Sequence, residues 1–298
     1  MSAFLTALFT GLRLGSIYAL VALGYTMVYG IIKLINFAHG DFIMVGGYSL
    51  FFVVPIVQKM GLPGWLAVIV AVVICSAIGM MTELIAYRPV RRNGTNMTAL
   101  ITAISVSLVL ENLAQAIPAM GPNPRVVNSI FGNEGITVAG ASLSYVTIIT
   151  IVVSAVVMVL LYTFTQKSKT GRAMRAVSED KQAATLMGIN VNRTIITTFG
   201  IGAGLAGVAA LMYLAQYPSV TNTMGSTLGL YAFIAAVLGG IGSLPGAMLG
   251  GFVIGIVYSF SSAYISSSLA SAFVFLILII VLLVKPTGIL GKNVGEKV

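Results

Sequence analysis

The chain has 298 residues, of which 58% are hydrophobic and only 8% are charged, whereas charged residues make up about 25% of an ordinary soluble domain. This composition excludes a soluble globular protein and indicates a polytopic protein embedded in membrane lipid. The formal net charge is +9, but the basic residues cluster between long apolar segments, as they do in the cytosolic loops of membrane proteins. The charge therefore indicates orientation in the membrane, and we expect no nucleic-acid partner.

The first apolar segment, 14–32, carries no charge and is long enough to cross a bilayer. The segment 33–41 that follows contains a glycine and four polar side chains: Lys33, Asn36, His39 and Asp41. Broken backbone at membrane depth is tolerated only where protein buries it or where it lines a wet cavity. The pattern predicts a broken helix or a re-entrant bend near 33–41.

Further apolar segments lead to the middle of the chain at 42–57, 60–82, 97–117 and 145–164. The segment 60–82 is followed by Arg88, Pro89 and Arg91, which end it and mark a cytosolic edge. The third carries a carboxylate and an amide well inside it, Glu111 and Asn112. The segment 118–142 is rich in Gly, Pro and Asn and predicts an external loop of turns.

A polar, mostly basic segment at 166–193 interrupts the apolar pattern with eight charged residues. Inserting it into the bilayer would cost roughly 20 kcal/mol or more, so it is expected to be a cytosolic loop. Ser178 is the predicted N-cap of a short helix near 178–188, with Glu179 and Asp180 in its first turn and Gly188 as its stop. Considered alone, the segment favours an ordinary basic loop over a docking element.

The last part of the chain has no Asp, Glu, Lys or Arg between 194 and 284. This length fits four spans joined by turns at 216–223, 242–246 and 261–268. Even numbers of spans between the basic clusters place these clusters on one side. We expect an all-α fold: one polytopic transmembrane helical bundle over 1–298, with about nine spans (eight to ten) and the N-terminus outside.

Glycine-rich segments exclude one class of function and predict helix packing. The segment 202–207 matches the dinucleotide motif G-x-G-x-x-G, but no strand precedes it and no acidic residue follows it at the required distance. Gly200 and Gly204, like Ala203 and Gly207, are small residues four positions apart that let two helices approach closely in lipid. No phosphate-binding G-x-x-x-x-G-K-[ST] motif occurs, so any ATP that drives the protein must bind to another chain.

Ionisable side chains within spans tend to mark pathways or pairings. His39 and Asp41 could form a proton relay or could cap the ends of the broken helix, and capping is the favoured interpretation. Glu111 with Asn112 is a pathway candidate, although a hydrogen bond between helices explains the pair equally well. We find no metal-ligand cluster and no catalytic motif, so the sequence predicts no enzyme.

Several segments together resemble the permease subunits of bacterial branched-chain amino-acid ABC transporters, and the first of them is closer to the LivH-type subunit than to its LivM-type partner. They occur in order between about residues 10 and 291: INFAHGD (35–41), AYRPVRR (86–92), GRAMRA (171–176), ATLMGIN (184–190), LGGIGS (238–243) and KPTG (285–288). The segment Gln182 to Gly188 also resembles the EAA…G loop of ABC-importer permeases, with Gln182 in place of the usual glutamate.

The resemblance implies a permease subunit in the bacterial inner membrane that works with a second, LivM-type permease, two cytosolic ATPase subunits and a periplasmic substrate-binding protein. ATP and Mg²⁺ would bind to the ATPases, and this chain would need no cofactor. The cytosolic loop 166–193 would contact the ATPases through Arg172, Arg175, Glu179, Asp180, Lys181, Gln182, Ala183, Ala184 and Gly188. The pathway candidates would be Asn36, His39, Asp41, Glu111 and Asn112.

The expected substrates are leucine, isoleucine and valine, because branched-chain amino acids are the commonest cargo of the family. Relatives of such permeases also resemble transporters of urea and short amides, which is the first alternative. The second is a proton-coupled secondary transporter that works alone, but membrane acids and bases are few here. A channel is disfavoured because no filter repeat is present.

Overall fold

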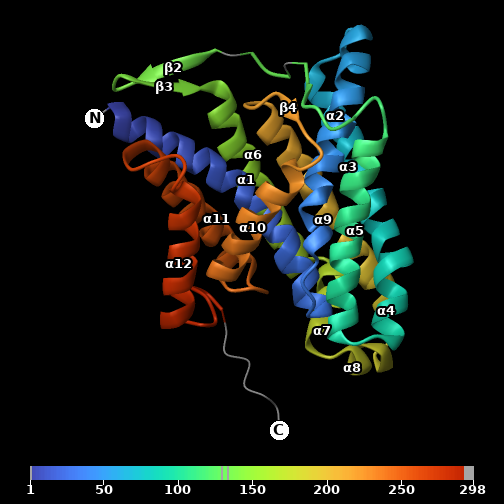
Figure 1. Ribbon diagram of the computed structural model, residues 1–298. Coiled ribbons are helices and arrows are strands. Elements are labelled where there is room, and N and C mark those ends of the chain that lie inside the picture. The colour runs from blue at the N-terminus through green and yellow to red at the C-terminus, as the bar shows by residue number, and fades with distance from the viewer. Residues whose placement is uncertain (1, 129, 133, 292–298) are drawn as a thin grey trace.

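The computed structural model describes residues 2–128, 130–132 and 134–291. The basic tail at 292–298 lies outside this part of the chain. Helices make up most of the described structure (Figure 1). They are α1 (Ser2–Ile32), α2 (Asp41–Lys59), α3 (Ala67–Thr82), α4 (Arg88–Asn93), α5 (Asn96–Ala116), α6 (Tyr145–Lys167), α7 (Lys169–Glu179), α8 (Lys181–Leu186), α9 (Val191–Leu214), α10 (Met224–Gly239), α11 (Leu244–Tyr264) and α12 (Ala270–Val284).

Helix α1 is the centre of the bundle. It runs obliquely from the N-terminal end of the molecule to the opposite end and packs against α11, α9, α10 and α6 (Figure 1). The contact with α11 is close because glycines face each other: a Cβ atom on Gly15 would lie 2.8 Å from the Cα atom of Phe252, and one on Gly255 would overlap Gly15. Small residues allow such approaches between helices in lipid.

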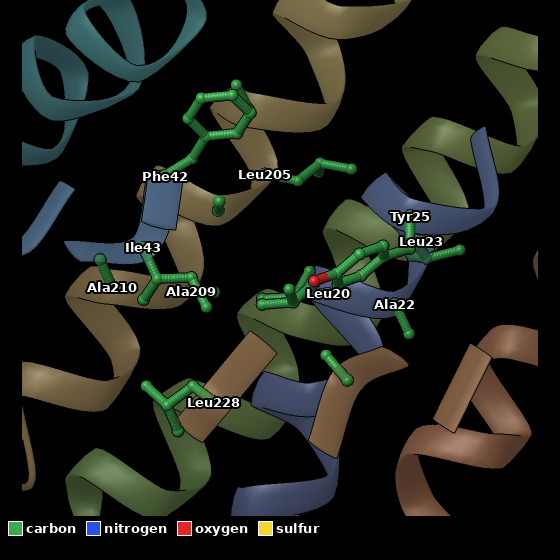
Figure 2. Packing of buried hydrophobic residues seen from close by; sticks show 14 of the residues in the cluster. Leu20, Ala22, Leu23, Tyr25, Phe42, Ile43, Leu205, Ala209, Ala210 and Leu228 are labelled. Carbon is green, nitrogen blue, oxygen red and sulfur yellow. The ribbon is translucent and has the colours of Figure 1, made fainter. Parts of the chain in front are cut away.

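The densest apolar packing lies where α1, α2, α9 and α10 meet (Figure 2). Leu20 of α1, Phe42 of α2, Ala209 of α9 and Leu228 of α10 are all buried there. Helix α9 also packs along α3, where Gly204 approaches Ser76 and Gly207 approaches the backbone of Val72. The glycine-rich segment therefore packs helices, as the sequence predicted.

Between α1 and α2 the chain breaks, as predicted. Lys33 has a left-handed φ of 58°, and a short 3₁₀ turn at Phe37–His39 precedes α2. The His39 ring lies against Gly24, eight residues before the end of α1, or about 12 Å along the helix axis. Helix α2 therefore begins within the bundle rather than at its edge. A re-entrant bend stays a prediction.

Seven helical segments in the described structure are long and apolar enough to cross a membrane, and α10 and α12 are shorter apolar helices. The chain is therefore a multi-pass membrane protein, and the count of about nine spans stays a prediction.

The described part of the chain also contains four short strands, which the expected all-α fold did not include. They are β1 (Arg125–Val126), β2 (Gly135–Val138), β3 (Ala141–Ser144) and β4 (Ser219–Val220).

The strands form two small antiparallel pairs, β1 with β4 and β2 with β3. They lie in the connections at 118–142 and 216–223, which the sequence predicted only as turns. The β2–β3 hairpin lies beside the N-terminal end of α1, whereas α4, α7 and α8 lie at the opposite end of the bundle (Figure 1). This separation agrees with an N-terminus on the side opposite the basic clusters.

The sequence predicted one short helix near 178–188 that begins at Ser178, and this predicted start is wrong. Two helices occupy this region, because Asp180 has an extended backbone (φ −152°, ψ 116°) that separates α7 from α8. The Asp180 carboxylate caps α8 by accepting hydrogen bonds from the backbone N–H groups of Gln182 and Ala183, at 2.7 and 3.0 Å. Ser178 lies inside α7, where its hydroxyl donates to the Arg175 carbonyl. Gly188 does end the helical region, with a φ of 80°.

Candidate functional site

His39 occupies a narrow slot between two helices. A Cβ atom on Gly24 of α1 would overlap its imidazole ring, and one on Gly202 of α9 would lie 3.3 Å from its Cε1 atom. The rings of Tyr25 and Phe42 lie 4.6 and 5.7 Å from the His39 ring, centroid to centroid. Glycine at both helix positions is therefore what lets the imidazole enter the bundle.

The structure contradicts the capping interpretation of His39 and Asp41. Each is 1% exposed; the His39 ring lies close to the backbone of Val21 in α1 and the Asp41 carboxylate close to the side chain of Ser107 in α5, so neither side chain is directed to the backbone groups freed at the break. The N-cap of α2 is Gly40, and no side chain caps either the 3₁₀ turn or α2.

Asn36 joins the break to the turn that precedes α4. Its side-chain oxygen accepts a 2.7 Å hydrogen bond from the hydroxyl group of Tyr87, which ends a π-helical turn at Glu83–Tyr87. Glu83 begins that turn, is fully buried and forms a 2.7 Å ion pair with Arg91. Arg91 lies beyond this turn in α4, so the ion pair joins α4 to the turn.

The N-terminus of α10 touches the start of α2. A Cβ atom on Gly225 would lie 2.8 Å from the Asp41 Cα atom. The neighbouring Ser226 donates a short hydrogen bond to Glu111 of α5. The N-termini of α2 and α10 therefore lie close to the carboxylates of Asp41 and Glu111. Helix N-termini favour negative charge. Four candidates, Asn36, His39, Asp41 and Glu111, lie in this region.

Asn112 does not belong to this group. It is exposed, and its amide donates a 2.7 Å hydrogen bond to the Leu108 carbonyl of its own helix. Glu111 itself forms the hydrogen bond between helices that the sequence allowed as one of two interpretations. Among the described residues, no three His, Cys, Asp or Glu side chains lie close enough to hold a metal ion.

Helix α8 forms a small protruding surface at the end of the bundle that holds α4 and α7 (Figure 1). Ala184 is its buried anchor, whereas Leu186 and Met187 are 88% and 82% exposed. Large apolar side chains this exposed, in a polar segment, are typical of a contact surface for a partner. The sequence analysis missed both residues, although two adjacent apolar residues in a charged segment were a visible signal.

Arg172 and Arg175 contact the chain itself. Arg172 donates to the Lys167 carbonyl at 3.2 Å, and Arg175 donates a short hydrogen bond to the Thr165 carbonyl. Both carbonyls belong to the last turn of α6, where cations satisfy unpaired carbonyls and the helix dipole. In this structure the two arginines fasten α7 to α6.

Lys181 belongs to a positive cluster at the same end. Partial burial lowers the pKa of Lys181, and the positive charges of Arg91 and Lys33 lower it further. Three basic residues from the 33–41 break, α4 and α8 therefore lie within electrostatic range of one another. Such a cluster attracts acidic groups on a partner surface.

The comparisons with known proteins identify the family. The chain is 45% identical to the high-affinity branched-chain amino acid transport system permease protein LivH of Escherichia coli (strain K12), over 99% of this chain and 98% of LivH. It is 43% identical to BraD, a high-affinity branched-chain amino acid transport system permease protein of Pseudomonas aeruginosa, with the same coverage.

A solved structure, PsaBC from Streptococcus pneumoniae in complex with Fab, covers 96% of this chain and 93% of that chain, with a TM-score of 0.48 and 17% identity. The family described as "Branched-chain amino acid transport system / permease component" matches residues 7–282. On this match and on the full-length similarity to LivH and BraD, the chain belongs to that family of ABC importer permease subunits.

Proposed function

We propose that this chain moves leucine, isoleucine and valine across a bacterial inner membrane. It pairs with a LivM-type permease and receives substrate from a periplasmic binding protein. Two cytosolic ATPases bind ATP and Mg²⁺, so this chain needs no cofactor and performs no bond chemistry. The proposal is supported by the 45% identity to LivH over nearly the whole chain and by the exposed apolar pair on α8.

Coupling passes through the loop 166–193. A permease responds to ATP only if the ATPases contact its conformational states differently. Helix α8 presents Leu186 and Met187 for insertion into the partner, and Lys181 adds positive charge. Arg172 and Arg175 hold α7 on α6, so movement of α8 is transmitted to the end of that helix.

The pathway residues are Asn36, His39, Asp41 and Glu111. Asn36, His39 and Asp41 are buried polar residues near the place where the N-termini of α2 and α10 meet, beside the Ser226–Glu111 hydrogen bond. Such groups can gain partners when the bundle opens, which lowers the free energy of a second conformation. Asn112 is satisfied within α5 and lies outside the proposed pathway.

The first experiment purifies the chain from its native membrane and measures leucine uptake in vesicles. Co-purifying ATPases and uptake that requires ATP but not a proton gradient are expected. Uptake of urea or acetamide in place of leucine would replace the substrate proposal. A chain that purifies alone and responds to the proton gradient would instead be a secondary transporter.

The coupling surface is tested with the double substitution Leu186→Ser/Met187→Ser. Removing an apolar contact centre costs about 2 kcal/mol or more, which is about thirty-fold in affinity. We expect loss of ATPase co-purification and of uptake, with normal membrane insertion. Leu283→Ser/Val284→Ser is the matched control, because these residues of α12 are 80% and 81% exposed. Equal loss in both variants would contradict the assignment to α8.

A further inference from the structure

Arg13 is a buried cation that neither the family match nor the pathway explains. It lies on α1 and is 7% exposed. Its Nη1 atom donates to the Thr147 hydroxyl of α6, and its Nη2 atom donates to the Tyr217 hydroxyl, both at 3.3 Å. The guanidinium carbon also lies 5.7 Å from the centre of the Tyr217 ring.

These contacts leave the guanidinium group poorly satisfied. An arginine has five N–H donors and keeps its charge in proteins. Two of them are used here, both at distances beyond the usual range for N–H···O bonds, and Nε is buried without a partner. Within the described residues, the one ion pair is Arg91 with Glu83, so no carboxylate neutralises Arg13. A buried cation with neutral partners alone is unfavourable.

A polar cavity lies beside the guanidinium group. It has a volume of about 410 Å³. Besides Arg13, it is lined by the apolar side chains Phe9, Ile136 and Leu143 and by hydroxyl and amide side chains from α1, the β2–β3 hairpin, α6 and the turn after α9: Thr6, Thr10, Thr137, Ser142, Thr147 and Gln216. A second cavity of about 860 Å³ shares Thr6, Thr10, Thr137 and Ser142, and adds Leu14 and Tyr258. The two cavities therefore adjoin along α1, and Leu14 contributes an apolar side chain to the second.

The position of Arg13 suits an entry site. It lies 19 residues before the end of α1, about 28 Å along the axis of this oblique helix. Residues of the β2–β3 hairpin line the cavity, and this hairpin lies at the end of the bundle opposite α8 (Figure 1). Tyr217 directly precedes Pro218 and β4, the strand that leads into α10.

We propose that Arg13 binds the carboxylate group of the transported amino acid at the external mouth of the permease. The planar guanidinium fork matches a carboxylate with two parallel hydrogen bonds, and the unused donors on Arg13 are available for them. The Leu14 side of the adjoining cavity receives the aliphatic side chain. This inference rests on the proposed function, because it takes the cargo to be an amino acid.

The test measures binding of 4-methylpentanoate, a carboxylate with a leucine-like chain, to the purified complex in lipid nanodiscs. Saturation-transfer NMR gives affinities, with 4-methylpentanamide as the uncharged comparison. We expect the wild type to bind the carboxylate at least about tenfold more tightly than the amide, since hydrogen bonds to charged groups are the stronger ones. Arg13→Gln should remove this preference, and Arg13→Lys should keep part of it.

Two further variants separate binding from folding. Thr10→Phe fills the cavity and leaves Arg13 in place, so it should abolish carboxylate binding without lowering the unfolding temperature. Leu283→Ser is the control, because Leu283 lies on α12 and lines neither cavity, and it should leave the preference unchanged. A carboxylate preference that persists in folded Arg13→Gln or in Thr10→Phe overturns the proposal. Displacement by inorganic phosphate or glycerol phosphate at equal concentration also overturns it, because the site would then bind lipid headgroups or anions in general.

The two experiments distinguish an error in the Arg13 site from an error in the proposed function. If leucine uptake is ATP-driven but Arg13→Gln keeps the carboxylate preference, the importer assignment stands and the Arg13 site is wrong. If the wild type prefers the carboxylate through Arg13 but does not take up leucine, the site stands and the substrate proposal is wrong.

Discussion

Gly24 determines whether His39 can enter the bundle. The imidazole ring lies where the Cβ atom of any other residue at position 24 would be. Closely packed interiors accommodate such overlaps only by shifting side chains or backbone, at a cost of about 1–3 kcal/mol. The slot therefore depends on one missing methyl group in α1.

We expect Gly24→Ala to lower the unfolding temperature of the purified protein, because overlap with His39 outweighs the gain of about 1 kcal/mol in helix propensity. Gly30→Ala is the matched control in the same helix, since nothing lies within 4 Å of its Cβ position, and it should be neutral or stabilising. Adding His39→Ala should rescue Gly24→Ala. Equal stability of the two single variants would show that the ring can move out of the slot.

At the scale of elements, glycines of α9 set its distance from α3. A Cβ atom on Gly207 would lie 3.2 Å from the Val72 Cα atom and 3.3 Å from the Ala71 carbonyl oxygen. Because these neighbours are backbone atoms, they cannot move aside without separating the helices. The pathway candidates depend on this contact, since His39 lies against Gly202 of the same helix.

Gly207→Val should therefore separate α9 from α3 and destabilise the protein by about 1–3 kcal/mol. Thermal unfolding in detergent measures the change. Val208→Leu is the control one residue away, at a position that is only half-buried, and it should alter the unfolding temperature little. If Gly207→Val were as stable as Val208→Leu, the close approach of the two helices would not contribute to stability.

The whole molecule has two chemically different ends. The N-terminal end of α1 and the β2–β3 hairpin lie at one end, whereas α7 and α8 lie at the other (Figure 1), and hairpin residues line the cavity beside Arg13. Basic residues concentrate near α8, and such clusters stay on the cytosolic side. The cavity beside Arg13 and the apolar pair on α8 should therefore be reached from opposite sides of the membrane.

Cysteine labelling tests this orientation. The native Cys75 is fully buried, so the wild type should not react with a membrane-impermeant maleimide. We expect Ser142→Cys to react in intact spheroplasts and Lys167→Cys to react only after permeabilisation, because both positions are exposed at opposite ends of the bundle. Reaction of both variants from the same side would contradict the two-sided arrangement.

Properties that depend on composition or on one stretch of backbone could be predicted from the sequence. The apolar composition determined the membrane class, the polar residues at 33–41 marked the break after α1, and Gly188 marked the end of α8. The small residues of α9 predicted close helix packing. In each case the physical cause lies in the residues themselves: transfer into lipid, backbone conformation or the absence of a side chain.

Side-chain partners were decided by the tertiary structure. Arg91 rather than Arg88 reaches Glu83 because a π-helical turn rotates the chain between them. His39 and Asp41 were expected to cap helix ends, but packing buries them beside Val21 of α1 and Ser107 of α5 instead. Arg13 meets Thr147 and Tyr217, which are 134 and 204 residues away. Local sequence cannot specify such contacts, because the packing of distant helices determines which side chains meet and which remain available to bind a ligand.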